Sequence, residues 1–126
     1  MKMKRVALIA HDGKKDDLVE FVQAHADWFG HRKLMGTGTT GGRIRKLGLS
    51  IECLASGPLG GDAQIAARIT EGQLDAVIFF RDPMGKHPHE PDVNMLLRQC
   101  DVHNVVLATN RASADLLVRA ANLDEE

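Results

Sequence analysis

The sequence predicts a doubly wound α/β fold, in which helices cover both faces of a five-stranded parallel sheet. Short, continuous apolar runs, typical of strands buried on both faces, alternate strictly with segments whose apolar residues recur at helical spacing. No repeat, low-complexity segment or linker divides the chain. We therefore expect residues 1–126 to form one domain.

The apolar runs are the predicted strands, and helical spacing follows each of them. The strands are expected at residues 5–10, 32–36, 50–55, 76–80 and 105–108. The helices are expected from about Asp16 through Phe29, through Ile44 to a stop at Gly48, from near Ala63 to Gly72, from about Asp92, and from a cap at Ser113. The proline-containing segment 81–91 is predicted to be irregular. Such alternation is typical of flavodoxin-like and Rossmann-like folds.

In sheets of this kind, ligands bind outside the carboxyl ends of the strands. Most of the reactive side chains in this sequence follow a predicted strand and would meet at that edge. They are His11, Asp12, Lys15, Thr37, Thr39, Thr40, Ser56, Asp62, Asp82, His89, Thr109 and Asn110. The sequence therefore predicts a ligand site there.

The segment Ser56–Asp62 joins the third strand to a helix and is rich in glycine. Such a loop lets backbone amides approach an anion, and it delivers one carboxylate, Asp62, to a helix N-terminus. The functional interpretation makes Asp62 a catalytic base. The structural interpretation makes it an N-cap, because Asp is among the preferred N-cap residues.

The run Thr37–Gly42 offers hydroxyl donors beside a second helix start, where phosphate or carboxylate could bind. Gly36, Gly38 and Gly41 also match a dinucleotide fingerprint, but the acidic residue of that fingerprint belongs where Ser56 stands. The sequence contains no GxxxxGK[ST] motif, which excludes a P-loop. A receiver domain would have Asp in place of Ser56 and Lys after the fifth strand, so we exclude it too.

The remaining features exclude other classes of protein. Sixteen basic and seventeen acidic residues leave no overall field that would attract nucleic acid or a membrane. The apolar run 6–10 is too short for a signal-peptide core or a membrane span. Cys53 and Cys100 have no metal-ligand spacing, and we expect both to be reduced and buried in a cytoplasmic protein. His87 and His89 lack a further ligand at a recognisable spacing, so we expect no metal.

Five motifs in one register resemble the methylglyoxal synthase family. They are His11-Asp12-x-x-Lys15, Thr37-Gly38-Thr39-Thr40-Gly41, Ser56-Gly57-Pro58-Leu59-Gly60-Gly61-Asp62, Phe79-Phe80-x-Asp82-Pro83 and Pro88-His89-x-Pro91-Asp92. The resemblance runs from about residue 6 to residue 117 and also includes Ala108-Thr109-Asn110.

The resemblance implies a lyase that converts dihydroxyacetone phosphate to methylglyoxal and inorganic phosphate without a metal or organic cofactor. It implies that Asp62 is the general base and that His89 acts at the carbonyl end of the substrate. The substrate-binding residues that it implies are His11, Lys15, Thr37, Gly38, Thr39, Thr40, Ser56 and Gly57. It makes Asp12, Asp82 and Asp92 supporting acidic residues.

The resemblance also implies a homohexamer and inhibition by inorganic phosphate. The arginine-bearing C-terminal extension of longer members has no equivalent here, so we expect catalysis to persist and phosphate-mediated communication between subunits to be weaker. The alternative is a non-catalytic ligand-sensing domain of the same fold, such as the regulatory end of carbamoyl-phosphate synthetase. The presence of Asp62 and His89 favours the enzyme.

Overall fold

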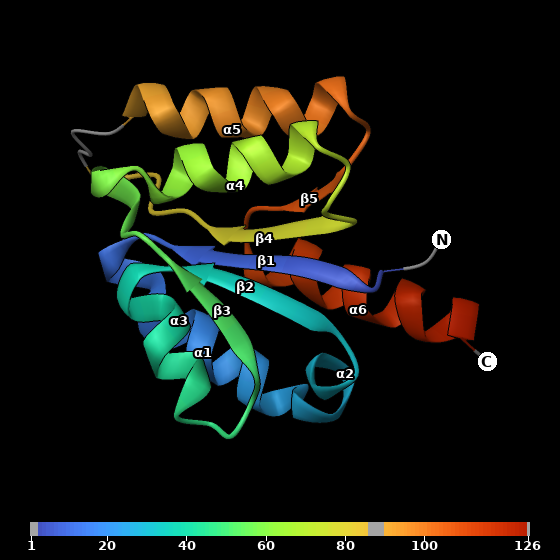
Figure 1. Ribbon diagram of the computed structural model, residues 1–126. Coiled ribbons are helices and arrows are strands. Elements are labelled where there is room, and N and C mark those ends of the chain that lie inside the picture. Colours follow the sequence, from blue (N-terminus) through green and yellow to red (C-terminus); the bar gives the residue numbers. More distant parts are fainter. Residues whose placement is uncertain (1–2, 86–89, 126) are drawn as a thin grey trace.

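A computed structural model of the chain describes residues 3–85 and 90–125. Within these residues, five parallel strands form one sheet in the order β3-β2-β1-β4-β5 (Figure 1). The strands are β1 (Arg5–Ala10), β2 (Lys33–Thr37), β3 (Ile51–Leu54), β4 (Ala76–Phe80) and β5 (Val106–Ala108). This order is that of a Rossmann-type sheet, so the predicted fold class is confirmed.

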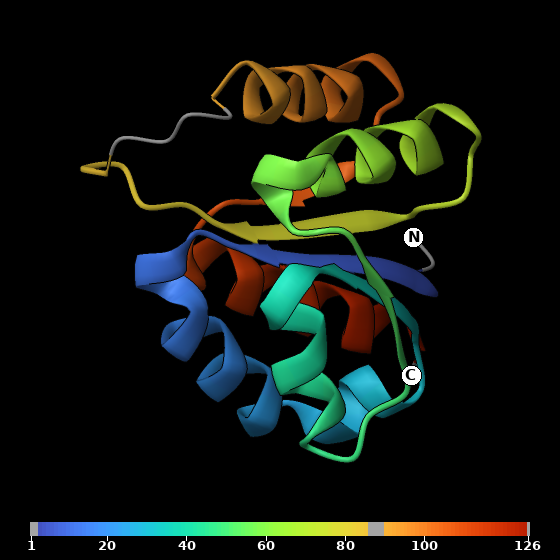
Figure 2. The same cartoon turned by 60° about the vertical axis from the view of Figure 1, so that its left-hand side comes forward.

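Helices cover both faces of the sheet, as Figures 1 and 2 show. On one face lie α1 (Lys15–Ala24), α2 (Ala26–Gly30), α3 (Gly38–Arg45) and α6 (Arg111–Glu125). On the other lie α4 (Gly61–Thr70) and α5 (Glu90–Val102). Two short 3-10 turns, η1 (Asp12–Lys14) and η2 (Gly57–Leu59), precede α1 and α4.

The alternating side chains of β1 divide the core between these two layers. Val6 and Leu8 pack with Phe21 on the side of α1, whereas Ala7 and Ile9 pack with the helices α4 and α5. All four β1 residues are at most 3% exposed. Burial on both faces explains why this strand is apolar throughout rather than alternating.

The chain reverses its direction of crossover between β1 and β4, which pair from Val6↔Ala76 to Ala10↔Phe80. In open α/β sheets, such a switch point opens a crevice at the carboxyl ends of the strands. The loops that follow β1, β2, β3 and β4 all begin at this edge. The fold therefore provides the edge at which the sequence predicts a ligand site.

The boundaries of three predicted helices differ from the prediction. The helix expected from Asp16 through Phe29 is two helices, because His25 has φ −119° and ψ 32° between them. Helix α3 begins at Gly38, so most of the Thr-rich run is helical rather than a loop, and it ends at Arg45. Helix α5 begins at Glu90 and includes Pro91, because a proline is tolerated in a first turn.

The predicted cap at Ser113 is wrong, since α6 begins at Arg111. Asn110 is the capping residue: its Oδ1 accepts a 2.9 Å hydrogen bond from the Ser113 N–H, and its own N–H donates to Ser113 Oγ at 3.3 Å. Asn and Ser cap helices about equally well, so the sequence did not separate the two positions. Ser113 instead completes a reciprocal pair of the capping-box kind.

The prediction that both cysteines are buried is half right. Both are free thiols, and Cys100 is buried between α5 and the sheet. Cys53 is exposed, because β3 is an edge strand. A continuous apolar run is typical of a strand covered on both faces, whereas an edge strand such as β3 is partly open to solvent.

Candidate active site

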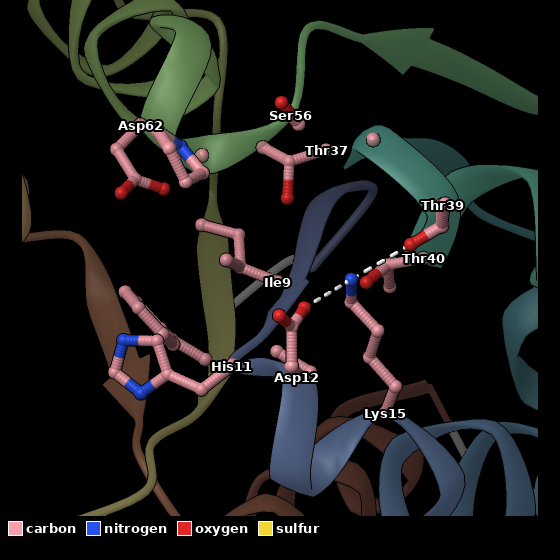
Figure 3. Close-up of a pocket in the computed structure, with 14 residues that line it drawn as sticks. Ile9, His11, Asp12, Lys15, Thr37, Thr39, Thr40, Ser56 and Asp62 are labelled. Carbon is pink, nitrogen blue, oxygen red and sulfur yellow. Dashed lines mark hydrogen bonds and ion pairs between the residues drawn. The ribbon is translucent and has the colours of Figure 1, made fainter. Parts of the chain in front are cut away.

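A cavity of about 280 Å³ lies at the carboxyl ends of β1, β2 and β3, and Phe79 of β4 also lines it (Figure 3). Sites for drug-sized ligands occupy about 300–1,000 Å³, so this one suits a ligand of few atoms. The residues that line it are Ile9, Ala10, His11, Asp12, Lys15, Thr37, Gly38, Thr39, Thr40, Ser56, Gly57, Pro58, Asp62 and Phe79.

One side of the cavity is cationic and rich in donors. Lys15 Nζ donates to Asp12 Oδ1 and to Thr39 Oγ1, each at 2.7 Å, which holds the ammonium group between α1 and α3. Thr37 and Thr40, at the start of α3, are 4% and 1% exposed. The α3 N-terminus adds backbone amides and the positive end of a helix dipole. This side can bind phosphate or carboxylate.

Asp62 supplies a carboxylate to the same cavity, and it is 1% exposed. It is the second residue of α4, so it lies within the first turn rather than at the N-cap, which is Gly60. In Figure 3, Asp62 and His11 lie on the side away from Lys15 and Thr39. The cavity therefore has a carboxylate and a histidine opposite its cationic side.

Close backbone packing fixes the segment that carries Asp62. The Gly61 N–H donates to the Ser56 oxygen at 2.8 Å. A Cβ on Gly61 would overlap the Ala55 carbonyl oxygen and lie 2.9 Å from the carbonyl carbon of Ser56. Only glycine fits here without moving the backbone.

The loops after β2 and β3 are tied together in the same way. Gly38, at φ +47°, donates its N–H to the Ala55 oxygen at 3.2 Å, and a Cβ there would lie 2.9 Å from Ser56. Gln64 of α4 reaches back, and its Oε1 accepts the Ala55 N–H at 2.8 Å. These hydrogen bonds fix the position of the Asp62 carboxylate relative to the cationic side of the cavity. Gln64 could not be identified from the sequence, because its contact depends on the path of the loop rather than on any local motif.

His11 is 5% exposed, and its ring lies edge-on to Phe79 with 5.0 Å between the ring centroids. The Asp82 backbone N–H donates to His11 Nδ1 at 2.9 Å. Because Nδ1 accepts this bond, the proton of the neutral imidazole is on Nε2. His11 can therefore act as a hydrogen-bond donor through Nε2.

The acidic residues of the predicted site are placed differently from one another. Asp12 lines the cavity, although its side chain is mostly exposed. The Asp82 carboxylate accepts the N–H groups of Met84 and Gly85 and so shapes its own loop. Asp92 lies in the first turn of α5 and is not among the residues that line the cavity.

The predicted role of His89 and the alternative metal site at His87 and His89 fall outside the residues that the structure describes. Across residues 3–85 and 90–125, no group of three His, Cys, Asp or Glu side chains could hold a metal ion. In the same part of the chain, no helix is both long enough and apolar enough to span a membrane.

Comparison with known proteins links this geometry to one family. A family model for the MGS-like domain matches residues 17–109. The chain is 55% identical over 123 residues to a methylglyoxal synthase from Ralstonia nicotianae, covering 97% of this chain and 91% of that protein. It is 53% identical over 117 residues to one from Thermus thermophilus, covering 92% and 93%. The crystal structure of methylglyoxal synthase from Elizabethkingia anophelis superposes with a TM-score of 0.86 at 47% identity, covering 92% of this chain and 77% of that one.

Proposed function

The chain belongs to the methylglyoxal synthase family, and we propose that it converts dihydroxyacetone phosphate into methylglyoxal and inorganic phosphate, with Asp62 as the general base. One observation carries this assignment of Asp62. A carboxylate that is 1% exposed lines the same small cavity as Lys15, which donates to Thr39 across the cationic side. A triose phosphate has the matching arrangement, with an acidic C–H a few atoms from a phosphate.

The phosphate binds between Lys15 and the first turn of α3. The ammonium group and the Thr39 hydroxyl are already within 2.7 Å of each other, so little reorganisation is needed on binding. Charge-assisted hydrogen bonds to phosphate are roughly twice as strong as neutral ones. This end of the site supplies most of the affinity and fixes the orientation of the substrate.

Asp62 then takes the proton from the carbon that bears the hydroxyl group. A carboxylate is a weak base for a carbon acid, so the developing enediolate needs donors already in place. The Nε2–H of His11 is one such donor on the Asp62 side of the cavity, held by the 2.9 Å bond from the Asp82 N–H to Nδ1. The family resemblance gives His89 a role at the carbonyl end as well.

Loss of phosphate completes the reaction. The hydroxyl oxygen on the deprotonated carbon gives up its proton and forms an aldehyde carbonyl, and the enediolate double bond shifts to the carbon that bears the phosphate. The C–O bond to the phosphate breaks, and phosphate leaves with that electron pair. The remaining enol takes a proton and becomes methylglyoxal. Elimination requires the breaking C–O bond to stand roughly perpendicular to the enediolate plane, because otherwise the same intermediate isomerises. Lys15 and Thr39 set this torsion by holding the phosphate.

The test is direct formation of methylglyoxal from dihydroxyacetone phosphate by the purified chain. We expect turnover in the presence of a strong chelator, because the proposed chemistry uses no metal. Binding of the substrate without any product would instead favour the ligand-sensing alternative. Product formed only after zinc is restored would move the chemistry to a metal site.

We extend the proposal to a homohexamer in the cytoplasm that is inhibited by its product, inorganic phosphate. The two free thiols suit a reducing compartment. Leu59 in η2 and Met84 in the segment after β4 are large apolar side chains that are 82% and 90% exposed, and contact with another subunit would cover them. Light scattering of the purified chain measures the assembly, and phosphate titration of the initial rate measures the inhibition.

A further inference from the structure

A second cavity, of about 500 Å³, opens at the carboxyl ends of β4 and β5, beside the starts of α1 and α6. Three cationic side chains, Lys14, Arg81 and Arg111, line it together with one acidic side chain, Asp17, and with Phe80 and Thr109. None of the three lines the active-site cavity. The chain as a whole carries a net charge of −1, so this gathering of positive charge is local.

The three cations come from three separate segments and already face acidic neighbours. Lys14 Nζ lies 4.0 Å from Asp17, Arg81 lies 3.4 Å from Glu90, and Arg111 lies 3.2 Å from Glu20. Each of these is a single contact between side chains that are 35–70% exposed.

Such exposed pairs contribute only about 0.2–1 kcal/mol each. An anion that contacts several of the cations at once can therefore displace their acidic partners. The ion pairs keep the cations near the cavity but are weak enough to exchange for a bound anion.

Arg111 is also the first residue of α6, so the positive end of that helix dipole adds to the field. Asn110 uses its Oδ1 to cap the Ser113 N–H, so the cap of this helix is a neutral side chain. The neighbouring Thr109 hydroxyl can serve as a further donor or acceptor.

We propose that this cavity is a second ligand site, which binds a small organic or inorganic polyanion. Three convergent cations select a ligand with more than one negative group, since a single carboxylate could satisfy only one or two of them. The cavity is also larger than the active-site cavity, at about 500 Å³ against about 280 Å³. A polyphosphate and a polycarboxylate share this chemistry, and the experiment separates them.

The test uses pyrophosphate and citrate as probes on the intact protein, with binding measured by calorimetry at low salt. We expect Arg111→Gln to weaken binding of the preferred probe about tenfold, since it removes one charge-assisted hydrogen bond from a partly exposed site. The double variant Lys14→Gln/Arg111→Gln weakens it further. Because pyrophosphate can also occupy the phosphate side of the active site, these titrations use the Lys15→Ala background, which leaves the second cavity intact, since Lys15 lines only the active-site cavity.

Arg119→Gln is the matched control, since Arg119 lies on the same helix, is 73% exposed and does not line the cavity. We expect it to bind the probe as the wild type does. Without any probe, Arg111→Gln should keep wild-type turnover, which distinguishes this site from the proposed active site. The inference is overturned if neither probe binds, if binding survives in the double variant, or if Arg119→Gln weakens binding equally.

Discussion

Gly61→Ala should damage both stability and catalysis, because the new methyl group meets backbone rather than flexible side chain. Its Cβ would overlap the Ala55 carbonyl oxygen and press on Ser56, so β3 or the start of α4 must move. Overpacking of this kind typically costs about 1–3 kcal/mol. With a urea m-value of about 2 kcal/mol/M, a 2 kcal/mol loss lowers the unfolding midpoint by about 1 M. Asp62 is the next residue, and a displacement of about 1 Å costs about 100-fold in rate.

The matched control is Gly42→Ala in helix α3. A Cβ there would meet no atom within 4 Å, and Gly42 is not among the glycines of positive φ. Replacing a helical glycine whose Cβ would meet open space stabilises by roughly 0.5–1 kcal/mol, so this variant should unfold at higher urea and keep its activity. Urea unfolding at one protein concentration, followed by circular dichroism, measures the stability of both variants, and the rate of methylglyoxal formation measures their activity. A Gly61→Ala protein as stable and active as Gly42→Ala would refute the close-packing argument.

Three further predictions concern other groups. Lys15→Ala should raise KM for dihydroxyacetone phosphate about 10–100-fold through loss of a charge-assisted bond, and initial-rate kinetics at varied substrate measure it; an unchanged KM would place the phosphate elsewhere. Burial raises the pKa of Asp75, but hydrogen bonds and charge from Arg5 lower it more, so the net pKa lies below its ordinary value. Its stabilisation is therefore present above about pH 4 and lost as the pH falls through the lowered pKa, and the wild-type advantage over Asp75→Asn in urea should shrink from pH 7 to pH 3. Burial, with a smaller effect of a neighbouring charge, raises the pKa of the Cys100 thiol to about 11, so an aromatic disulfide reagent at pH 8 should label Cys53 and spare Cys100 until the protein unfolds; equal labelling would contradict this burial.

The fold class could be predicted because strand burial and helical spacing are local properties of the sequence. β1 is apolar from Val6 to Ala10 and β4 is apolar throughout, and both are central strands. The exposure of Cys53 could not be predicted in this way, since it depends on which strand ends the sheet. Strand order depends on the crossovers, and the local sign of an edge strand in β3 is the charged residue Glu52, which is exposed.

The gathering of the site could be predicted from topology alone. Once five parallel strands are expected, the loops after them must share an edge, and Lys15, Thr39 and Asp62 do line one cavity there. The hydrogen bonds between the loops at that edge could not be predicted. The bond from the Ala55 N–H to Gln64 and the bond from the Asp82 N–H to His11 join residues whose separation in space is set only by the folded chain.

The account depends most on Asp62 as the base that acts on a bound triose phosphate. The measurement that tests it is the rate of methylglyoxal formation from dihydroxyacetone phosphate by Asp62→Asn, beside wild type and the exposed-surface control Asp101→Asn. We predict that Asp62→Asn lowers kcat by about 10²–10⁴-fold or more, while phosphate affinity stays within a fewfold of wild type and Asp101→Asn is unaffected. An Asp62→Asn enzyme that turns over at the wild-type rate would contradict the account and reduce Asp62 to a structural residue of the first turn of α4.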